Sequence, residues 1–292
     1  MGSASEGRSG ARLAIATCAE LPELDREGGM LLAACREAGI DARPVVWDDG
    51  AVDWGAFETV LIRSTWDYPA KQERFAAWAR ARGERLLNPL AAVEWNLSKR
   101  YLKELERWGL PIVPTAFIAP GDEPELPAAG EFVVKPAVSA GSRDTARYGA
   151  EEGERAVGHV SALLDQGRDV LVQPYLGSVE TAAETAVILL GGELSHAMRK
   201  GPLLERHQGV EQGLFRQEEM SPRQPDPAES RLASAVLERF SAEVCAPLYA
   251  RVDLLRSDGG EPCILELELI EPSLFLDHHP AAIDRLVGLL RG

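Results

Sequence analysis

Two alternating segments near the end of the chain carry the residue types best suited to chemistry. The first contains Arg251 and Asp253, the second contains Glu266 and Glu268, and the turn sequence 257–260 separates them. This pattern predicts a β-hairpin, in which alternate side chains share one face. Three carboxylates and a guanidinium would then share one pocket, where a hard divalent cation would relieve the repulsion between the acids. A solvated sheet face is the alternative.

A second candidate site lies at the end of the apolar run 132–135. Lys135 ends this run, and the small-residue loop Ser139-Ala140-Gly141-Ser142 follows it. Small residues let backbone amides approach phosphate oxygens, and a lysine adds positive charge. By itself the fragment also fits an ordinary strand end and loop. Lysine is rare in this chain, however, and occurs only at Lys71, Lys99, Lys103, Lys135 and Lys200.

A third polar cluster follows the apolar run 59–62. In an open parallel sheet, ligands bind beyond the carboxyl ends of the strands. A set that mixes arginine, an acid and aromatic rings suits a small zwitterion, because arginine can hold a carboxylate while Asp67 pairs with an ammonium. The alternative is that the cluster anchors a domain interface. The expected substrate-facing residues are Arg63, Ser64, Thr65, Trp66, Asp67, Tyr68, His196, Arg199 and Lys200.

The elements that must position these residues follow from the spacing of apolar residues. The first ninety residues alternate strands and helices, which is typical of an α/β parallel sheet. We expect strands at 13–16, 44–47 and 59–62, with helices at 30–39 and through Phe75 and Trp78. Further on we expect strands at 132–135, 170–173, 185–190, 250–255 and 264–269, and helices at 97–108, 152–166 and 230–243.

These elements suggest a leader and three structural units. Residues 1–10 are rich in glycine and serine and are expected to be disordered. The expected units are an N-terminal α/β domain on the substrate side (11–95), a central α+β subdomain (96–178) and a C-terminal subdomain that carries the metal site (179–292). Such a division suits a chain of 292 residues, because single cores stop growing near 250–300 residues.

Composition narrows the range of partners. The chain has 46 acidic and 31 basic residues, so a phosphate backbone or an anionic membrane surface would be repelled. Four cysteines lie far apart, and no export signal or phosphate-binding GxxxxGK[ST] motif is present. We therefore expect a cytoplasmic protein with a small-molecule substrate and without nucleic-acid or membrane partners. The oligomeric state, homo-oligomers included, stays open.

Taken in order, the charged and loop residues resemble the ATP-grasp superfamily between about residues 95 and 275. The resemblance implies an ATP-grasp fold, in which two α+β subdomains hold ATP, beside an N-terminal parallel-sheet domain. It implies that Lys99 and Lys135 contact phosphates, that 173–176 binds adenine, and that Glu184 holds the ribose. The implied nucleotide-binding residues are Lys99, Lys135, Ser139, Gly141, Ser142, Gln173, Pro174, Tyr175, Leu176 and Glu184.

The same resemblance implies roles for the hairpin. Asp253, Glu266 and Glu268 match positions that bind Mg²⁺, and Arg251 and Lys135 match groups that act on the reacting phosphoryl group. Glutathione synthetases and D-alanine:D-alanine ligases usually carry asparagine where this chain has Glu268. The sequence Leu-Glu-Leu-Glu at 265–268 is most similar to that of the small ATP-grasp ligases that include D-cycloserine synthetase.

The resemblance therefore implies an ADP-forming carboxylate–amine ligase that works through an acyl phosphate. Its substrate would be small and amino-acid-like, and the reaction could join two molecules or cyclise one. A phosphotransferase on the same scaffold and a non-catalytic nucleotide-binding protein are the alternatives. Loop 139–142 and the polar stretch 199–226 are expected to cover the acyl phosphate and exclude water.

Overall fold

The apolar runs of the N-terminal part form a parallel sheet. The structure, a computed structural model, describes residues 12–204 and 219–291, so the expected leader at 1–10 lies outside it. The sheet has the strand order β2-β1-β3-β4, and every pairing in it is parallel, which confirms the prediction. Its elements are β1 (Arg12–Thr17), α1 (Arg26–Glu37), β2 (Asp41–Val46), β3 (Thr59–Ile62), α2 (Gln72–Arg82) and β4 (Leu86–Leu87).

Helix α1 begins four residues before the predicted start. Asp25 has an extended backbone, and its side chain accepts a hydrogen bond from Gly28 N at 3.1 Å. An aspartate at this position satisfies a free amide of the first turn, so it sets the start of the helix independently of apolar spacing. The amino end of α1 is thereby placed beside the carboxyl ends of the strands.

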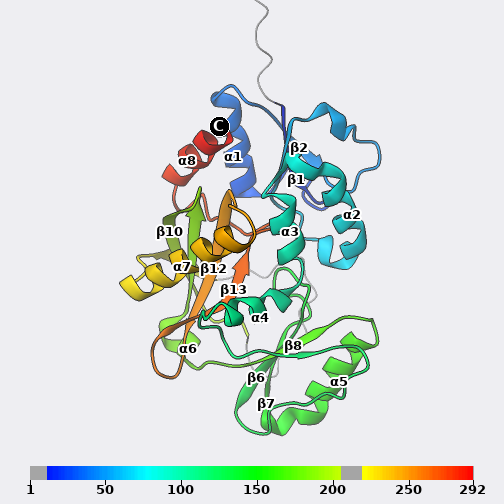
Figure 1. Cartoon of the computed structure of the whole chain (residues 1–292), viewed down its shortest axis with the longest axis vertical. Coiled ribbons are helices and arrows are strands. Elements are labelled where there is room, and N and C mark those ends of the chain that lie inside the picture. Colours follow the sequence, from blue (N-terminus) through cyan, green and yellow to red (C-terminus); the bar gives the residue numbers. More distant parts are fainter. Residues whose placement is uncertain (1–11, 205–218, 292) are drawn as a thin grey trace, which may run out of the picture.

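A four-stranded antiparallel sheet follows, at the opposite end of the molecule (Figure 1). Its strand order is β5-β8-β6-β7, and one long helix packs against it. Strands β6 and β8 were predicted, whereas the short strands β5 and β7 were not. The elements are β5 (Ala116–Ile118), β6 (Glu131–Pro136), β7 (Ala146–Gly149), α5 (Gly153–Leu164), β8 (Val170–Pro174) and the short helix α6 (Ser178–Ala182).

The C-terminal part forms a five-stranded sheet between the other two, with the order β11-β10-β9-β12-β13 (Figure 1). The predicted hairpin is confirmed, since β12 pairs antiparallel with β13. Arg251 lies opposite Glu268, and Asp253 lies opposite Glu266. The elements are β9 (Glu184–Leu190), β10 (Glu193–Lys200), β11 (Met220–Arg223), α7 (Pro227–Glu243), β12 (Tyr249–Arg256), β13 (Pro262–Glu268) and α8 (Ala281–Leu290).

The predicted helix at 97–108 is wrong in its first half. Ser98 adopts an extended backbone, and its hydroxyl accepts a hydrogen bond from Arg100 N, so the chain bends there. Because serine competes in this way for nearby backbone groups, it favours a helix boundary. The chain instead forms α3 (Leu90–Asn96), a 3₁₀ turn (Lys99–Tyr101) and α4 (Leu102–Arg107).

This segment satisfies the free edge of β13. The Asn96 amide donates to Leu267 O at 2.8 Å and accepts from Leu269 N at 2.8 Å. The Tyr101 hydroxyl accepts from Leu267 N at 3.0 Å. An edge strand exposes a row of backbone groups that need partners. Side chains therefore hold in place the strand that carries Glu266 and Glu268.

Asn88 joins the N-terminal sheet to the same region. It is fully buried, and its amide nitrogen donates to Tyr249 O and Leu269 O at 2.8 and 2.7 Å. Its amide oxygen accepts from Leu248 N and Tyr249 N. One side chain thus satisfies four backbone groups from two segments.

We expect Asn88→Ala to lower the free energy of unfolding by about 3 kcal/mol, because the buried backbone groups would lose their partners. Urea denaturation at pH 7 measures this loss. A loss below about 1 kcal/mol would show that water replaces the amide, and would contradict the assigned role.

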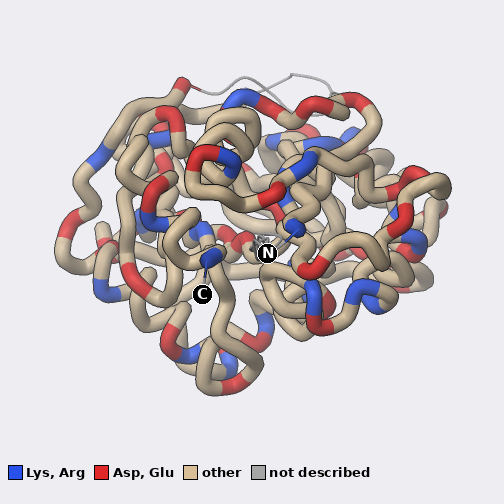
Figure 2. Tube along the Cα trace, turned by 90° about the horizontal axis from the view of Figure 1, so that it is seen from above, with Lys and Arg blue, Asp and Glu red and all other residues tan. Residues whose placement is uncertain are grey.

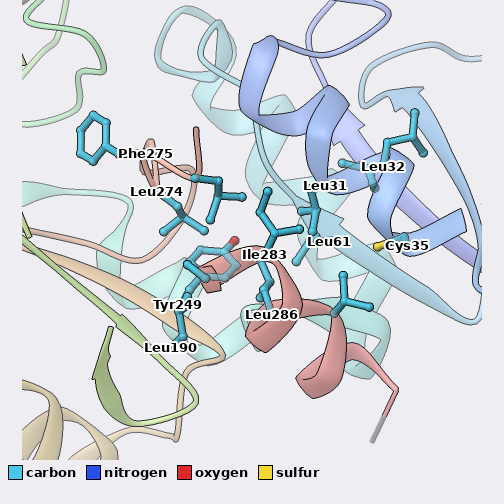
Figure 3. Close-up of a cluster of buried hydrophobic side chains, with 14 of the residues drawn as sticks. Leu31, Leu32, Cys35, Leu61, Leu190, Tyr249, Leu274, Phe275, Ile283 and Leu286 are labelled. Atoms are coloured by element: carbon cyan, nitrogen blue, oxygen red, sulfur yellow. The ribbon is translucent and has the colours of Figure 1, made fainter. Parts of the chain in front are cut away.

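The N-terminal and C-terminal parts share one hydrophobic cluster. Leu31 and Leu32 of α1 and Leu61 of β3 belong to the same cluster as Leu190 of β9 and Leu286 of α8 (Figure 3). Leu274 and Phe275, which follow β13, also belong to it (Figure 3). The segment after β13 is therefore enclosed by both parts of the molecule.

Charged residues of both signs are scattered along the chain, and lysine and arginine lie among the more numerous acidic residues (Figure 2). None of the helices within 12–204 and 219–291 is long and apolar enough to cross a membrane.

Candidate active site

A pocket of about 990 Å³ lies where the three sheets approach one another. One wall is apolar and is formed by Leu176, Val179, Leu255 and Leu265. The middle is charged, with cations and carboxylates from several strands. The remaining wall is formed by residues that come after β1, β3 and β13 in the chain. Its lining residues are Leu21, Leu24, Asp25, Arg26, Glu27, Trp66, Tyr68, Glu271, Ser273, Phe275 and Asp277.

Arg251 lies at the centre of the charged region. Its Nε donates to Asp253 Oδ1 at 2.9 Å, its Nη2 donates to Asp253 Oδ2 at 2.9 Å, and Nη2 also donates to Glu268. Arg251 is 6% exposed and Asp253 2% exposed, so this ion pair is almost dry. Burial alone would raise the pKa of Asp253, but Arg251 and Lys200 outweigh it and lower that pKa. The face shared by these side chains agrees with the parity predicted from the sequence.

The pKa of Glu268 is shifted in the opposite direction from that of Asp253. Burial raises the pKa of its carboxyl to about 7, Glu266 and Asp253 add to the rise, and Arg251 opposes it. Glutamate at this position therefore adds a charge that is costly in this pocket unless a cation is near.

Two lysines meet at Glu266. Lys99 Nζ lies 2.9 Å from Glu266 Oε1, and Lys135 Nζ lies 3.9 Å from Glu266 Oε2. Lys99 also donates to Ser139 O at 2.9 Å and to Ser139 Oγ at 3.1 Å. Burial lowers the pKa of Lys135, and Glu266 partly restores it. One carboxylate therefore lies beside both lysines.

Carboxylates on facing strands are the oxygen ligands that Mg²⁺ prefers. Within residues 12–204 and 219–291, however, no group of three or more histidine, cysteine or acidic side chains is arranged to hold a metal ion. The reason is that Asp253 and Glu268 turn to Arg251, while Glu266 turns to Lys99. The expected convergence of three carboxylates on an ion is thus not present in this arrangement. The donors fit Mg²⁺ in kind, provided that the cations turn to another anion.

The residues expected to bind the nucleotide line the same pocket. Gln173 is 2% exposed, and its side chain donates to Thr115 Oγ1 at 2.9 Å. Glu184 accepts from Lys200 Nζ at 2.6 Å, and Lys200 also lies 3.6 Å from Asp253. The pocket brings together Lys99, Lys135, Ser139, Gly141, Ser142, Gln173, Pro174, Tyr175, Leu176 and Glu184.

Loop 139–142 adopts a conformation that small residues allow. Gly141 has a φ of 60° and Ser142 a φ of 58°. Glycine adopts this left-handed region without cost, whereas serine does so rarely. The loop borders the pocket beside Lys99. The stretch 199–226 was also expected to cover the acyl phosphate, and its part at 205–218 lies outside the described residues.

Most residues expected to face the substrate do not line the pocket. Only Trp66, Tyr68 and Lys200 of that group do. Arg199 points away from Lys200, since successive residues of a strand lie on opposite faces. The expectation is wrong for Arg63, Ser64, Thr65, Asp67, His196 and Arg199.

Buried partners explain this difference. Arg63 donates to Glu27 Oε1 at 2.6 Å, and Asp67 accepts from Trp47 Nε1 at 2.7 Å and from Lys71 Nζ at 2.6 Å. Ser64 Oγ lies 2.8 Å from Thr17 Oγ1. Polar side chains that are 4% exposed or less need partners inside the protein. These side chains have the charges and donors that the prediction required, but they bond to other residues of the protein.

Several of these side chains hold the backbone that follows β13. Each carbonyl oxygen from Ile270 to Leu274 lies within hydrogen-bond distance of a side-chain donor. The donors are, in order, Tyr249 Oη at 2.8 Å, Trp66 Nε1 at 3.1 Å, Arg63 Nη2 at 2.7 Å, Arg251 Nη1 at 3.3 Å and His196 Nε2 at 2.8 Å.

Glu27 fixes the amides of the same segment, because its carboxylate accepts from Leu274 N at 2.9 Å and Leu276 N at 3.2 Å. Glu27 and Glu271 were not predicted from the sequence. The only available signal for Glu27 was its place in the first turn of a helix after β1.

Burial, and not the bond to Leu274 O, keeps His196 neutral near pH 7. Burial lowers the pKa of its imidazole to about 4, the bond to Leu274 O opposes the shift, and His279 adds to it. In the unfolded chain its pKa is near 6.5. The unfolded state therefore binds the proton first as the pH falls from about 6.5 to 4, and stability falls over that window.

We expect this proton to account for a loss of up to about 3 kcal/mol between pH 7 and pH 4. Glutamine can donate to Leu274 O without titrating, so His196→Gln should lose less stability over the same range. Urea unfolding at several pH values measures the difference. Parallel pH dependence in the two proteins would contradict the proposed role of His196.

The fold and this site define the class of protein. The structure resembles that of D-alanine–D-alanine ligase from Bacillus anthracis in complex with ATP, with a TM-score of 0.68 and 12% identity over 96% of this chain and 98% of that chain. At this identity the likeness concerns the fold, and the fold is ATP-grasp.

The sequence comparisons show the particular family. Cycloserine biosynthesis protein DcsG of Streptomyces lavendulae is 38% identical over 90% of this chain and 92% of its own length. The crystal structure of D-cycloserine synthetase DcsG is similar with a TM-score of 0.86 and 36% identity over 96% of this chain and 99% of that chain. Residues 13–88 match the model of the D-cycloserine synthetase DcsG N-terminal domain. The chain belongs to the D-cycloserine synthetase family of ATP-grasp ligases.

Proposed function

We propose that this ligase phosphorylates the carboxylate of a small amino acid with ATP and closes a ring within the same molecule, as the name of its relatives suggests for D-cycloserine. D-cycloserine is a cyclic amide of an amino acid, so one substrate supplies both the carboxylate and the nitrogen. Joining groups of one molecule replaces a second binding site by proximity.

The observation that carries the proposal is the charged middle of the pocket. Its four cations, Arg251, Lys99, Lys135 and Lys200, lie among four acids, Asp253, Glu184, Glu266 and Glu268. The apolar wall of the same pocket can receive a purine base. Phosphoryl transfer depends on positioning and on neutralising charge, which such cations provide. Mg²⁺, held by the hairpin carboxylates, would neutralise further charge on the phosphates.

Three of the cations act on ATP in the proposed reaction. Lys99, Lys135 and Arg251 bind the phosphates and hold the transferred group near the substrate carboxylate. A carboxylate oxygen takes the γ-phosphoryl group and ADP forms. The nitrogen then attacks the acyl carbon, phosphate leaves, and the nitrogen gives up a proton.

The test is a screen of small amino acids for ADP release with ATP and Mg²⁺. The panel includes D-serine derivatives with a nitrogen on the side-chain oxygen, and their L-enantiomers. A product that has lost one water marks ring closure, and a product of two molecules less one water marks intermolecular ligation. A stable phosphorylated product would instead assign a phosphotransferase. Absence of ADP release with every acid would contradict the proposal.

A cytoplasmic location, the absence of nucleic-acid and membrane partners, and the division into units at 11–95, 96–178 and 179–292 stay predictions. So do the individual roles of the pocket residues.

A further inference from the structure

Among the described residues, one acid of the pocket has no partner in the form of a hydrogen bond or ion pair to its carboxyl group, and this acid is Glu271. Glu271 is 8% exposed and lines the pocket. Within 12–204 and 219–291, its carboxyl group makes no hydrogen bond or ion pair with another residue. Nearby buried acids differ, because Asp253 pairs with Arg251 and Glu266 pairs with Lys99.

An unpaired buried carboxyl group is costly, and the structure shows the consequence. Burial raises the pKa of Glu271 well above its usual range, the carboxylates of Glu268 and Glu266 add to this, and Lys99 and Arg251 oppose it. A carboxyl group with such a shift, at the wall of a pocket, is a candidate for binding a ligand.

The backbone that presents Glu271 is held firmly. Its own carbonyl accepts from Trp66, and the carbonyls on either side lie within hydrogen-bond distance of Tyr249 and Arg63. A backbone that is fixed in this way loses little freedom when a ligand binds. The point on the chain from which Glu271 borders the pocket is thus set by the protein.

The surroundings of Glu271 select the charge of the ligand group. Asp25 and Asp277 line the same wall, and so does Arg26, whose side chain is 82% exposed and pairs with Asp277. Lys99 and Arg251 act on Glu271 from the charged middle of the pocket. Trp66 and Tyr68 line the wall as well. Carboxylates beside aromatic rings favour an organic cation.

The position of Glu271 relative to Arg251 narrows the choice of the ligand group that it binds. Arg251, which faces the transferred phosphoryl group in the proposed reaction, donates to Ser273 O, two residues beyond Glu271. In an amino acid, the α-ammonium is bonded to the carbon next to the carboxylate. A group that holds this ammonium must therefore lie close to Arg251, and Glu271 lies close enough for the Arg251 guanidinium to oppose the rise of its pKa.

We propose that Glu271 binds the α-ammonium group of the amino-acid substrate. The assignment rests on the proposed function, because it requires that an amino acid be the substrate. It makes Glu271 the residue that distinguishes amino acids from carboxylic acids without the amino group.

The experiment compares each active amino acid of the screen with the same acid lacking its α-amino group. We expect the wild type to prefer the amino acid by about a hundredfold in kcat/KM, the size of a charge-assisted hydrogen bond in a buried site. In Glu271→Gln the preference should fall below about tenfold, while the KM for ATP stays unchanged. Glu271→Asp, which keeps the charge, should recover part of it. Glu261→Gln, an exposed glutamate of the hairpin turn, is the matched control and should keep the full preference.

The outcomes separate the two proposals. If the wild type releases ADP with no acid, both fail. If the wild type is active and Glu271→Gln keeps the hundredfold preference, only the assignment of Glu271 is overturned. A fall in kcat with the preference intact would instead assign Glu271 to proton transfer and would equally overturn it. Were Glu271→Gln not to fold, a wild-type enzyme that accepts both acids equally would decide against the proposal.

Discussion

The Glu266→Gln variant is expected to lose ligase turnover by about a thousandfold and to remain folded. Glu266 holds Lys99 and Lys135 in the pocket and supplies a carboxylate for Mg²⁺ in the proposed reaction. Glutamine keeps the size of the side chain but removes its charge. Loss of one charged group that acts on the transition state costs about a hundredfold to a thousandfold, and loss of metal binding adds to this.

The measurement is ADP release at saturating ATP and substrate over a range of Mg²⁺ concentrations. The Mg²⁺ concentration for half-maximal rate should rise together with the loss of turnover. Glu261→Gln is again the control, because Glu261 belongs to the same hairpin but is exposed. Full activity of Glu266→Gln with an unchanged Mg²⁺ requirement would remove the main support for the metal assignment.

The second large effect is expected for the two buried lysines. Lys99→Met and Lys135→Met should each weaken ATP binding by about ten- to a hundredfold. A charge-assisted hydrogen bond to a phosphate contributes about 1.5–3 kcal/mol in such a site. Lys99 and Lys135 are 6% and 8% exposed, so water screens these interactions little.

Titration calorimetry with ATP and Mg²⁺ measures the affinity, and thermal unfolding confirms that each variant is folded. The control is Lys103→Met, since Lys103 is an exposed lysine of α4 that lies over the Phe117 ring rather than in the pocket. Normal ATP binding by both pocket variants would contradict the assignment of the lysines and, with it, the proposed nucleotide site.

Local patterns predicted the elements that contain their own signals. The hairpin of β12 and β13, the strand β3 and the parallel arrangement of the N-terminal sheet follow from alternation and from apolar runs. Strand β10 was missed because its sequence is mostly polar, and it is held by pairing with β9. Its residue His196 therefore lies inside a strand. A pairing partner distant in the sequence leaves no local trace.

The amino-acid sequence by itself determined which chemistry the pocket could contain. Side chains two residues apart in a strand share a face, so the grouping of Arg251 with Asp253, and of Glu266 with Glu268, depends only on local geometry. Only the tertiary structure decided which polar residues reach the pocket. Arg63 and His196 carry suitable groups, yet they bind the backbone after β13, because burial leaves each of them a protein partner close by. Within the described part of the chain Glu271 is left without one, and that depends on contacts among segments more than two hundred residues apart, which no local pattern records.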